Sequence, residues 1–178
     1  QVKEEKKFSL AVVLCKKCGL SQLSIIPNTK FIFSEYDYLS SSSSALSNHY
    51  KNLVKKLIKQ YKIKSFENIL DIGCNDGILL KHFPKRFKKL IGFEPSDASK
   101  YIKDRRIKLF RNFFGDATSK RYLKKFNKPK LITITNVLAQ IPNLEDFVRG
   151  LKNLLNENNL IVIEFPYLLD MINSSIFD

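Results

Sequence analysis

The residues in this sequence that are best suited to chemistry lie in the run NILDIGCNDGILLKHF, residues 68–83. Gly73 and Gly77 stand four positions apart, between an apolar segment and a second segment with helical apolar spacing. A strand that turns directly into a helix needs left-handed backbone, which costs about 1–2 kcal/mol per residue for most side chains but not for glycine. Asn75 is the residue type next most tolerant of this conformation. The run predicts a tight turn whose backbone a ligand can approach, although such a turn can also serve structure alone.

An acidic residue follows this turn at a distance typical of nucleoside-binding sites. The run LIGFEPSD closes a second apolar segment, and its Glu94 lies about twenty residues beyond the glycines. A carboxylate in that place can accept hydrogen bonds from both hydroxyls of a ribose lying across the strand ends. The alternative is an exposed loop glutamate, and the spacing favours the ribose.

The turn favours one nucleoside ligand over another. Turns that bind NAD carry Gly-x-Gly-x-x-Gly, whereas this chain has Gly-Cys-Asn-Asp-Gly, and Asp76 would face a pyrophosphate unfavourably. A carboxylate-lined loop suits a ligand that carries an ammonium or sulfonium charge. S-adenosylmethionine (SAM) carries both, so SAM is the expected cofactor.

The elements that must position these residues alternate along the chain. We expect strands at 68–72, 89–94, 107–110, 130–136 and 160–164, and helices at 77–83, near 97–103, near 117–125 and at 144–155. Such alternation indicates βαβ units and a parallel sheet, and right-handed crossovers place the loops after the strands on one edge. The predicted fold class is α/β, with ligands bound at that edge.

A smaller unit precedes the α/β part. Residues 8–14 form a β-like run that ends in Cys15-Lys-Lys-Cys18. Five serines, Ser40–Ser44, then lead into a segment with helical apolar spacing up to residue 61, and a serine is a favourable helix N-cap. The boundary between the two parts is expected near residues 40–50.

Composition narrows the class of protein. The chain has 178 residues, of which 44% are apolar, and it contains three cysteines and no apolar run long enough to span a bilayer. We expect a folded protein with reduced cysteines and a cytoplasmic location. The net charge of +14 invites a nucleic-acid interpretation, but the lysines are dispersed over nearly every segment instead of clustered between aromatic residues, so nucleic-acid binding is not favoured.

The order of motifs resembles the SAM-dependent sugar C-methyltransferases of deoxysugar biosynthesis. The matching runs are LCKKCGLSQL, EYDYLSSSSSALSNHY, LDIGCNDGILL, IGFEPS, RNFF, TNVLAQIPNLEDFVRGLKNLL and VIEFPYLLDMI, which extend from about residue 10 to the end. The resemblance implies part of an N-terminal zinc-binding module over residues 1–45 and a Rossmann-like methyltransferase core over residues 46–178. It also implies a longer protein with a C-terminal domain.

The resemblance assigns roles to residues of this chain. The implied cofactor-binding residues are Asp71, Gly73, Asn75, Asp76, Gly77, Glu94, Pro95, Ser96, Phe113, Phe114 and Asn136. Glu94 with its two following residues would hold the ribose, and one of the two phenylalanines would lie near the adenine. Core packing is the alternative for both rings, and we expect it to hold for one of them. Cys15 and Cys18 would supply half of a four-ligand zinc site.

Carbon methylation in this family requires an enolate beside the ketone of a nucleotide-linked 4-keto sugar, and hence a base and donors for the oxyanion. Tyr36 and Tyr38 stand at the family's Tyr-x-Tyr motif, with packing as the alternative for either. Gln140 stands where the family has histidine, and it cannot act as a base near neutral pH. The family's Tyr-x-x-His segment would follow residue 178. We therefore expect the 178-residue chain to bind SAM but to be inactive.

Two other functions remain open from the sequence. A SAM-binding module that has lost catalysis would account for Gln140 and for the missing histidine. A nucleic-acid methyltransferase would account for the charge, but the run TNVLAQ lacks the Asn/Asp-Pro-Pro-aromatic turn usual for base methylation. The expected partner is a nucleotide-sugar substrate, and self-association of the truncated chain is a further expectation.

Overall fold

A five-stranded parallel sheet forms the centre of the chain in the computed structural model, which describes residues 7–9, 11–28 and 38–176. Its strands are β3 (Ile69–Ile72), β4 (Leu90–Phe93), β5 (Ile107–Phe110), β6 (Leu131–Thr135) and β7 (Leu160–Glu164). Their order across the sheet is β5-β4-β3-β6-β7. The predicted α/β class and the strands predicted for this sheet are confirmed.

The strand order creates a crevice at the carboxyl edge of the sheet. From β3 the chain proceeds outward to β4 and β5, and then returns to pair β6 on the other side of β3. The connections after β3 and β6 therefore lead in opposite directions, and a crevice opens where they part. The turn at residues 73–77 follows β3 directly, so it lies at this crevice.

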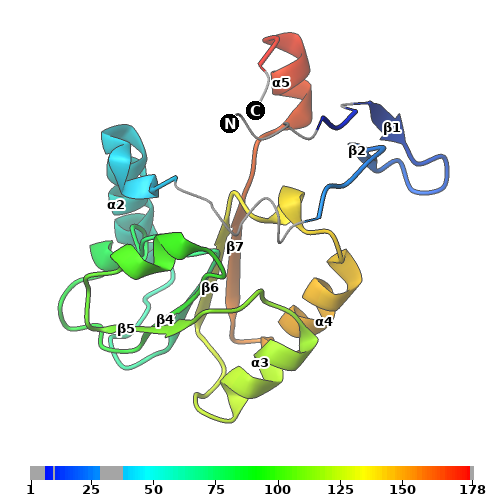
Figure 1. Cartoon of the computed structure of the whole chain (residues 1–178). Helices are drawn as coiled ribbons and strands as arrows, with labels where there is room; N and C mark the ends of the chain where they lie inside the picture. Colours follow the sequence, from blue (N-terminus) through cyan, green and yellow to red (C-terminus); the bar gives the residue numbers. More distant parts are fainter. Residues whose placement is uncertain (1–6, 10, 29–37, 177–178) are drawn as a thin grey trace, which may run out of the picture.

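One face of the sheet is covered by the long helix α2 (Ser44–Gln60; Figure 1). The Ser43 side chain accepts a hydrogen bond of 3.2 Å from the Leu46 amide and caps the helix, as a serine was expected to do. The helix buries Tyr50, Val54 and Leu57, whose spacing places them on one face. This face packs in an apolar cluster with the segment after the turn and with the starts of the strands.

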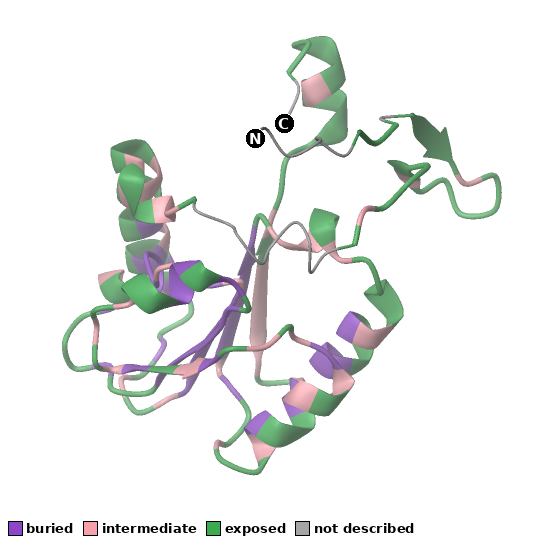
Figure 2. Cartoon of the chain, viewed as in Figure 1, coloured by how far each residue is buried: buried purple, intermediate pink, exposed green. Residues whose placement is uncertain are grey.

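The opposite face is covered by α3 (Asp116–Leu123) and α4 (Leu144–Leu154; Figure 1). The Asn143 side chain caps α4 by accepting a hydrogen bond of 3.0 Å from the Asp146 amide. Tyr122 and Phe147 are fully buried in the second apolar cluster, which contains the alternate residues of the central strands. Figure 2 shows the buried residues concentrated in the central strands and on the inner faces of these helices.

Two segments that were predicted as helices are not α-helical. The segment predicted at 77–83 is a series of turns followed by the 3₁₀ helix η2 (Leu80–His82). Gly77 is left-handed with φ +78°, and Phe83 is extended because Pro84 follows it, so too few residues remain for an α-helix. The segment predicted near 97–103 is the 3₁₀ helix η3 (Asp97–Tyr101).

The N-terminal part is an antiparallel hairpin of β1 (Val12–Leu14) and β2 (Ser21–Leu23), which lies away from the five-stranded sheet in Figure 1. The strand predicted at 8–14 is thus shorter than expected, and its partner was not predicted. A short helix, α5 (Leu168–Asn173), follows β7. Within the described part of the chain, no helix is long and apolar enough to cross a membrane. The division at residue 45 stays a prediction.

Candidate functional site

A cleft of about 590 Å³ lies at the carboxyl edge of the sheet, over the ends of β3, β4 and β6. The predicted site residues that line it are Tyr38, Asp71, Gly73, Asn75, Glu94, Pro95, Phe113, Phe114, Asn136 and Gln140. Asp76, Gly77 and Ser96 adjoin these residues in the chain but are not part of the lining. Tyr36 lies outside the described residues. The fold thus gathers most of the predicted site into one cleft.

The glycine turn has the backbone that its residue types predicted. Gly73, Asn75 and Gly77 have φ values of +75°, +50° and +78°, so the expected left-handed conformations are confirmed. A Cβ atom on Gly73 would lie 2.2 Å from Val137 Cγ2, which follows β6. The absence of a side chain at this position therefore allows the two loops at the crevice to approach each other.

Glu94 presents its carboxylate at the cleft in a fixed orientation. The side chain is 6% exposed, and each of its oxygens accepts a backbone hydrogen bond of 2.8 Å, one from the Asn75 amide and one from the Ser96 amide. A carboxylate oxygen can accept more than one hydrogen bond. Glu94 therefore braces the glycine turn and keeps acceptor capacity for a ligand with paired hydroxyl groups.

The side chains of Asn75 and Asp76 face a segment that is distant in the sequence. The Asn75 amide donates to the Tyr38 carbonyl oxygen at 3.0 Å and accepts from the Ser40 amide at 2.9 Å. Asp76 Oδ2 accepts from the Ser41 amide at 3.3 Å. Asp76 Oδ1 is buried without a hydrogen-bond partner among the described residues. The side chains of Asn75 and Asp76 thus hold residues 38–41 beside the glycine turn. The sequence did not predict these contacts.

Asp71 is a fully buried carboxyl group at the floor of the cleft. Burial raises its pKa to about 7, with a further increase from the negative charge of Glu94. The Thr133 hydroxyl opposes this shift by donating a 2.6 Å hydrogen bond to Asp71 Oδ1. The contact follows from the sheet register, because Asp71 and Thr133 are partners in the pairing of β3 with β6.

Tyr50 is a cleft residue that the sequence did not single out. It lies on the buried face of α2, lines the cleft, and donates a 3.2 Å hydrogen bond to Thr135 Oγ1. Burial raises the pKa of the Tyr50 hydroxyl, and the negative charges of Asp71 and Glu164 raise it further. The hydrogen bond to Thr135 acts in the opposite direction and lowers this pKa. A tyrosine in an otherwise apolar helical stripe was the available signal, since a buried phenol needs a polar partner.

The two adjacent phenylalanines have different surroundings. The Phe114 ring makes edge contacts with Phe93 and Phe147, at centroid distances of 5.2 and 5.3 Å. Phe113 is 44% exposed and lines the cleft. The expectation that one of the two rings packs in the core is confirmed for Phe114, whereas Phe113 is the more exposed of the two.

The two histidines do not line the cleft. His49 Nε2 lies 2.6 Å from Glu164 Oε2 and joins α2 to the end of β7. His82 Nε2 lies 3.2 Å from Ser47 Oγ, and burial lowers the pKa of this imidazole. Both histidines therefore connect elements around α2, and neither is in place to remove a proton from a ligand in the cleft.

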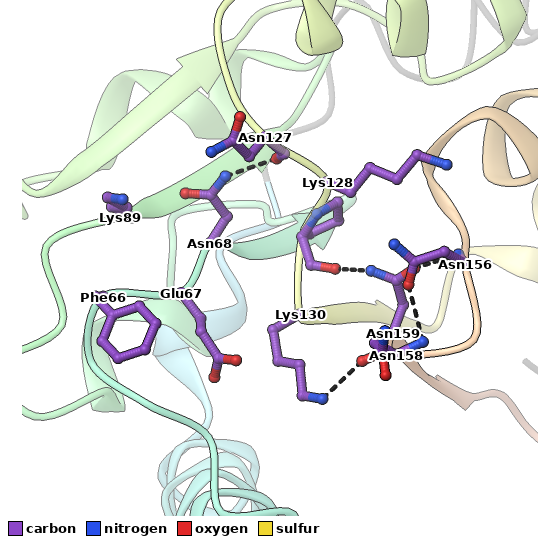
Figure 3. A pocket seen from close by; sticks show the side chains of 11 residues that line it. Phe66, Glu67, Asn68, Lys89, Asn127, Lys128, Lys130, Asn156, Asn158 and Asn159 are labelled. Atoms are coloured by element: carbon purple, nitrogen blue, oxygen red, sulfur yellow. Dashed lines mark hydrogen bonds between the residues drawn. The ribbon is translucent and has the colours of Figure 1, made fainter.

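A second, smaller hollow of about 290 Å³ lies at the opposite edge of the sheet, where the strands begin (Figure 3). Its polar side chains hold neighbouring loops together. Lys130 Nζ donates to the Asn158 carbonyl oxygen at 2.7 Å, and Asn68 Nδ2 donates to the Asn127 carbonyl oxygen at 2.6 Å. These contacts are shown in Figure 3, and they connect the segments before β3 and β6 with the loop before β7.

The predicted zinc ligands, Cys15 and Cys18, lie in the loop of the N-terminal hairpin. The pKa of the Cys15 thiol is lowered, mainly by hydrogen bonds from the backbone amides of Cys18 and Lys17. A lowered thiol pKa favours the thiolate, which is the metal-binding form. Within the described residues, however, no group of three or more histidine, cysteine and acidic side chains gathers to hold a metal. The role of these two cysteines as zinc ligands thus stays a prediction.

The sequence matches a protein family and an individual relative, a C-methyltransferase. The family described as a methyltransferase domain matches residues 27–173. The C-methyltransferase NovU of Streptomyces niveus is 23% identical over 175 residues, which are 98% of this chain and 42% of NovU. The chain therefore spans less than half the length of this relative.

Solved structures share the fold. The plantazolicin methyltransferase BpumL, in complex with a triazolic desmethylPZN analog and SAH, superposes with a TM-score of 0.53 at 18% identity over 78% of this chain and 60% of that chain. A SAM-dependent methyltransferase from Archaeoglobus fulgidus gives a TM-score of 0.50 at 22% identity over 71% of this chain and 59% of that chain.

The match to the methyltransferase-domain family covers residues 27–173, from before α2 to the end of α5. The chain therefore belongs to this family.

Proposed function

We propose that this chain is the cofactor-binding part of a SAM-dependent enzyme that methylates a carbon atom of a nucleotide-linked 4-keto deoxysugar through an enolate. The observation that carries the proposal is the buried Glu94 carboxylate, held by two backbone amides at the crevice beside the glycine turn. The match to a C-methyltransferase over nearly the whole chain supports carbon as the methylated atom.

The residues of the cleft fit SAM. Glu94 would accept hydrogen bonds from the ribose hydroxyls, and Gly73 leaves room for a ligand against the backbone. Phe113 offers a half-exposed ring for the adenine, and Asp71 supplies a carboxyl group at the floor. When bound, SAM supplies an electrophilic methyl group for transfer.

Other cleft residues could serve the sugar. Tyr38 is 48% exposed at the mouth of the cleft, and Gln140 lines it from the 3₁₀ helix η4 (Leu138–Gln140). The Gln140 amide can donate a hydrogen bond to a sugar oxygen, whereas the Tyr50 hydroxyl already donates its proton to Thr135. The Gln140 donor would stabilise negative charge on an enolate oxygen.

Proton removal from the sugar needs a base, and this proposal assigns the carboxyl groups of Asp71 and Glu94 in the described cleft to the cofactor. Neither His49 nor His82 lines it, and Gln140 stands where the resembling family has histidine. The proposal therefore assigns the base to a group outside the described residues, either Tyr36 or a residue beyond the length of this chain. Gln140 also favours a second candidate function, a module that binds SAM without catalysis.

Deuterium exchange in heavy water tests the proposed reaction. A protein extended to the length of the C-methyltransferase relative should incorporate deuterium beside the ketone of a nucleotide-linked 4-keto sugar without SAM. With SAM it should transfer the methyl group to that carbon. We expect neither reaction from the 178-residue chain, because loss of an acid–base group removes about 10²–10⁴-fold in rate.

The outcomes of this experiment separate the candidates. Methyl transfer by the 178-residue chain would place the base within it and contradict the assignment made above. An extended protein that binds SAM but neither exchanges the proton nor transfers the methyl group would favour the module without catalysis.

A further inference from the structure

The segment 38–42 is held against the glycine turn by side chains of the turn itself. Asn75 makes two of these hydrogen bonds, to the Tyr38 carbonyl oxygen and the Ser40 amide, and we call this pair of bonds the latch. Asp76 adds a longer contact of 3.3 Å to the Ser41 amide. The latch thus joins residues 35 and 37 positions apart in the sequence.

The latch requires an asparagine. Its amide oxygen accepts from the Ser40 amide and from the Asp76 amide, both at 2.9 Å, while its nitrogen donates to a carbonyl oxygen. Only one orientation of the amide satisfies all three contacts. An aspartate would keep the acceptor but would place an oxygen against the Tyr38 carbonyl. The φ of +50° adds a second requirement that asparagine tolerates.

The same residue contacts the expected cofactor site through its backbone. The Asn75 amide donates to Glu94 Oε2, the carboxylate assigned to the ribose, while its side chain holds the segment that contributes Tyr38 and Ser40 to the cleft lining. One residue therefore connects Glu94 with the segment 38–42. A ligand that fixes Glu94 also fixes the backbone from which the latch is made.

We propose that Asn75 is a positioning residue that couples occupancy of the cofactor site to the position of segment 38–42. This inference rests on the proposed function. Cofactor bound at Glu94 stiffens the turn, the latch closes more firmly, and Tyr38 is placed over the cleft. The acceptor sugar then meets its binding segment only after the cofactor is in place, so binding is ordered with the cofactor first.

Amide exchange measured by NMR on the 178-residue chain tests the coupling. The reporters are the Ser42 and Ser43 amides, whose acceptors are the carbonyl oxygens of Leu39 and Ser40, so their exchange reports opening of the turn that the latch holds in place and not loss of an acceptor on Asn75. Asn75→Gly removes the latch, while glycine accepts the positive φ without strain. Lys62→Gly is the matched control, because exposed Lys62 also has φ +50° but makes no latch contact.

S-adenosylhomocysteine (SAH), the demethylated product of SAM, is the probe. In the wild-type chain and in Lys62→Gly, saturating SAH should slow exchange of both reporters about tenfold, the effect of about one hydrogen bond. Asn75→Gly should exchange at least about tenfold faster without SAH and gain no protection with it. Because coupling is reciprocal, Asn75→Gly should also weaken SAH binding by about the factor lost in protection.

The outcomes distinguish this inference from the function on which it rests. No SAH binding by the wild-type chain would overturn the proposed function and the coupling with it. SAH binding that leaves the two reporters unchanged would overturn the coupling alone. Asn75→Asp provides a second variant that keeps the acceptor for Ser40 and loses the donor to Tyr38. Full SAH-dependent protection in Asn75→Asp would also overturn the latch.

Discussion

At the scale of single residues, the fold buries one carboxyl group of the cleft, Asp71, in surroundings that are unfavourable for its charged form. Its carboxyl group is fully buried, and its partner is the Thr133 hydroxyl rather than a cation. Burial of a carboxylate favours its protonated form, which is why the pKa rises to about 7. A ligand with an ammonium or sulfonium charge in the cleft would favour the ionised form instead.

Replacement of the ionisable carboxyl group of Asp71 should change how the free energy of unfolding depends on pH. The folded chain retains a proton on Asp71 that the unfolded chain releases near pH 4, so the contribution of this group is complete below that pH and falls as the pH rises toward 7. Asp71→Asn keeps the acceptor for Thr133 and removes the ionisation. Between pH 4 and 8 the unfolding free energy of the wild type should fall relative to Asp71→Asn by on the order of 3 kcal/mol.

Urea unfolding at several pH values measures this difference. Thr133→Val offers a companion variant, because loss of the hydrogen bond that lowers the pKa should move the titration of Asp71 to higher pH. If the unfolding free energies of the wild type and Asp71→Asn changed in parallel with pH, burial would not raise the pKa of Asp71.

Sequence reasoning succeeded at the residues whose role is set by local geometry. Gly73, Gly77 and Asn75 were identified because left-handed backbone restricts the residue types that can adopt it. It did not identify Tyr50, whose partner Thr135 is 85 positions away, or the contact of Asn75 with Tyr38. Such side-chain pairs depend on how distant elements pack, which one sequence does not display.

At the scale of elements, α3 and α4 approach each other at a glycine. A Cβ atom on Gly150 of α4 would lie 2.7 Å from the carbonyl carbon of Gly115 and 2.9 Å from Phe114 Cε1. The first of these neighbours is backbone just before α3, which cannot rotate away as a side chain could. The close packing of the two helices therefore depends on the absence of a side chain at position 150.

Gly150→Ala tests this contact. Alanine would favour the helix by about 1 kcal/mol, whereas overpacking costs about 1–3 kcal/mol and should prevail against backbone. We expect the free energy of unfolding in urea to fall by up to about 2 kcal/mol. Lys152→Ala, an exposed change on the same helix, should alter it by less than about 0.5 kcal/mol. A more stable Gly150→Ala protein would contradict the close approach.

The strands of the sheet and the longer helices could be predicted because buried apolar periodicity continues along them. The exceptions were short segments. The run before Pro84 carries helical apolar spacing, but the backbone limits at Gly77 and Phe83 leave only the 3₁₀ turn η2. The hairpin partner Ser21–Leu23 has three residues and no buried ones, so it gives little hydrophobic pattern to identify.

At the scale of the whole molecule, the strand order brings the chemistry to one edge. Residues from the N-terminal segment, from three strand ends and from η4 meet in a single cleft because the chain changes direction between β3 and β6. The lysines that give the net charge of +14 are dispersed along the sequence, so any nucleic-acid binding is expected to be non-specific and salt-sensitive. Zinc binding and self-association also stay predictions.

Calorimetric titration of the 178-residue chain with SAH tests the central claim that this cleft is the cofactor site. The wild-type chain should bind SAH, and Glu94→Ala should weaken binding by about 1–3 kcal/mol, or roughly 10–100-fold, because the ribose loses its acceptor and the turn loses its brace. Asp97→Ala, an exposed carboxylate paired with Lys100 outside the cleft, should change affinity less than about twofold. Equal affinity of the wild type and Glu94→Ala for SAH, or no binding by either, would contradict the account.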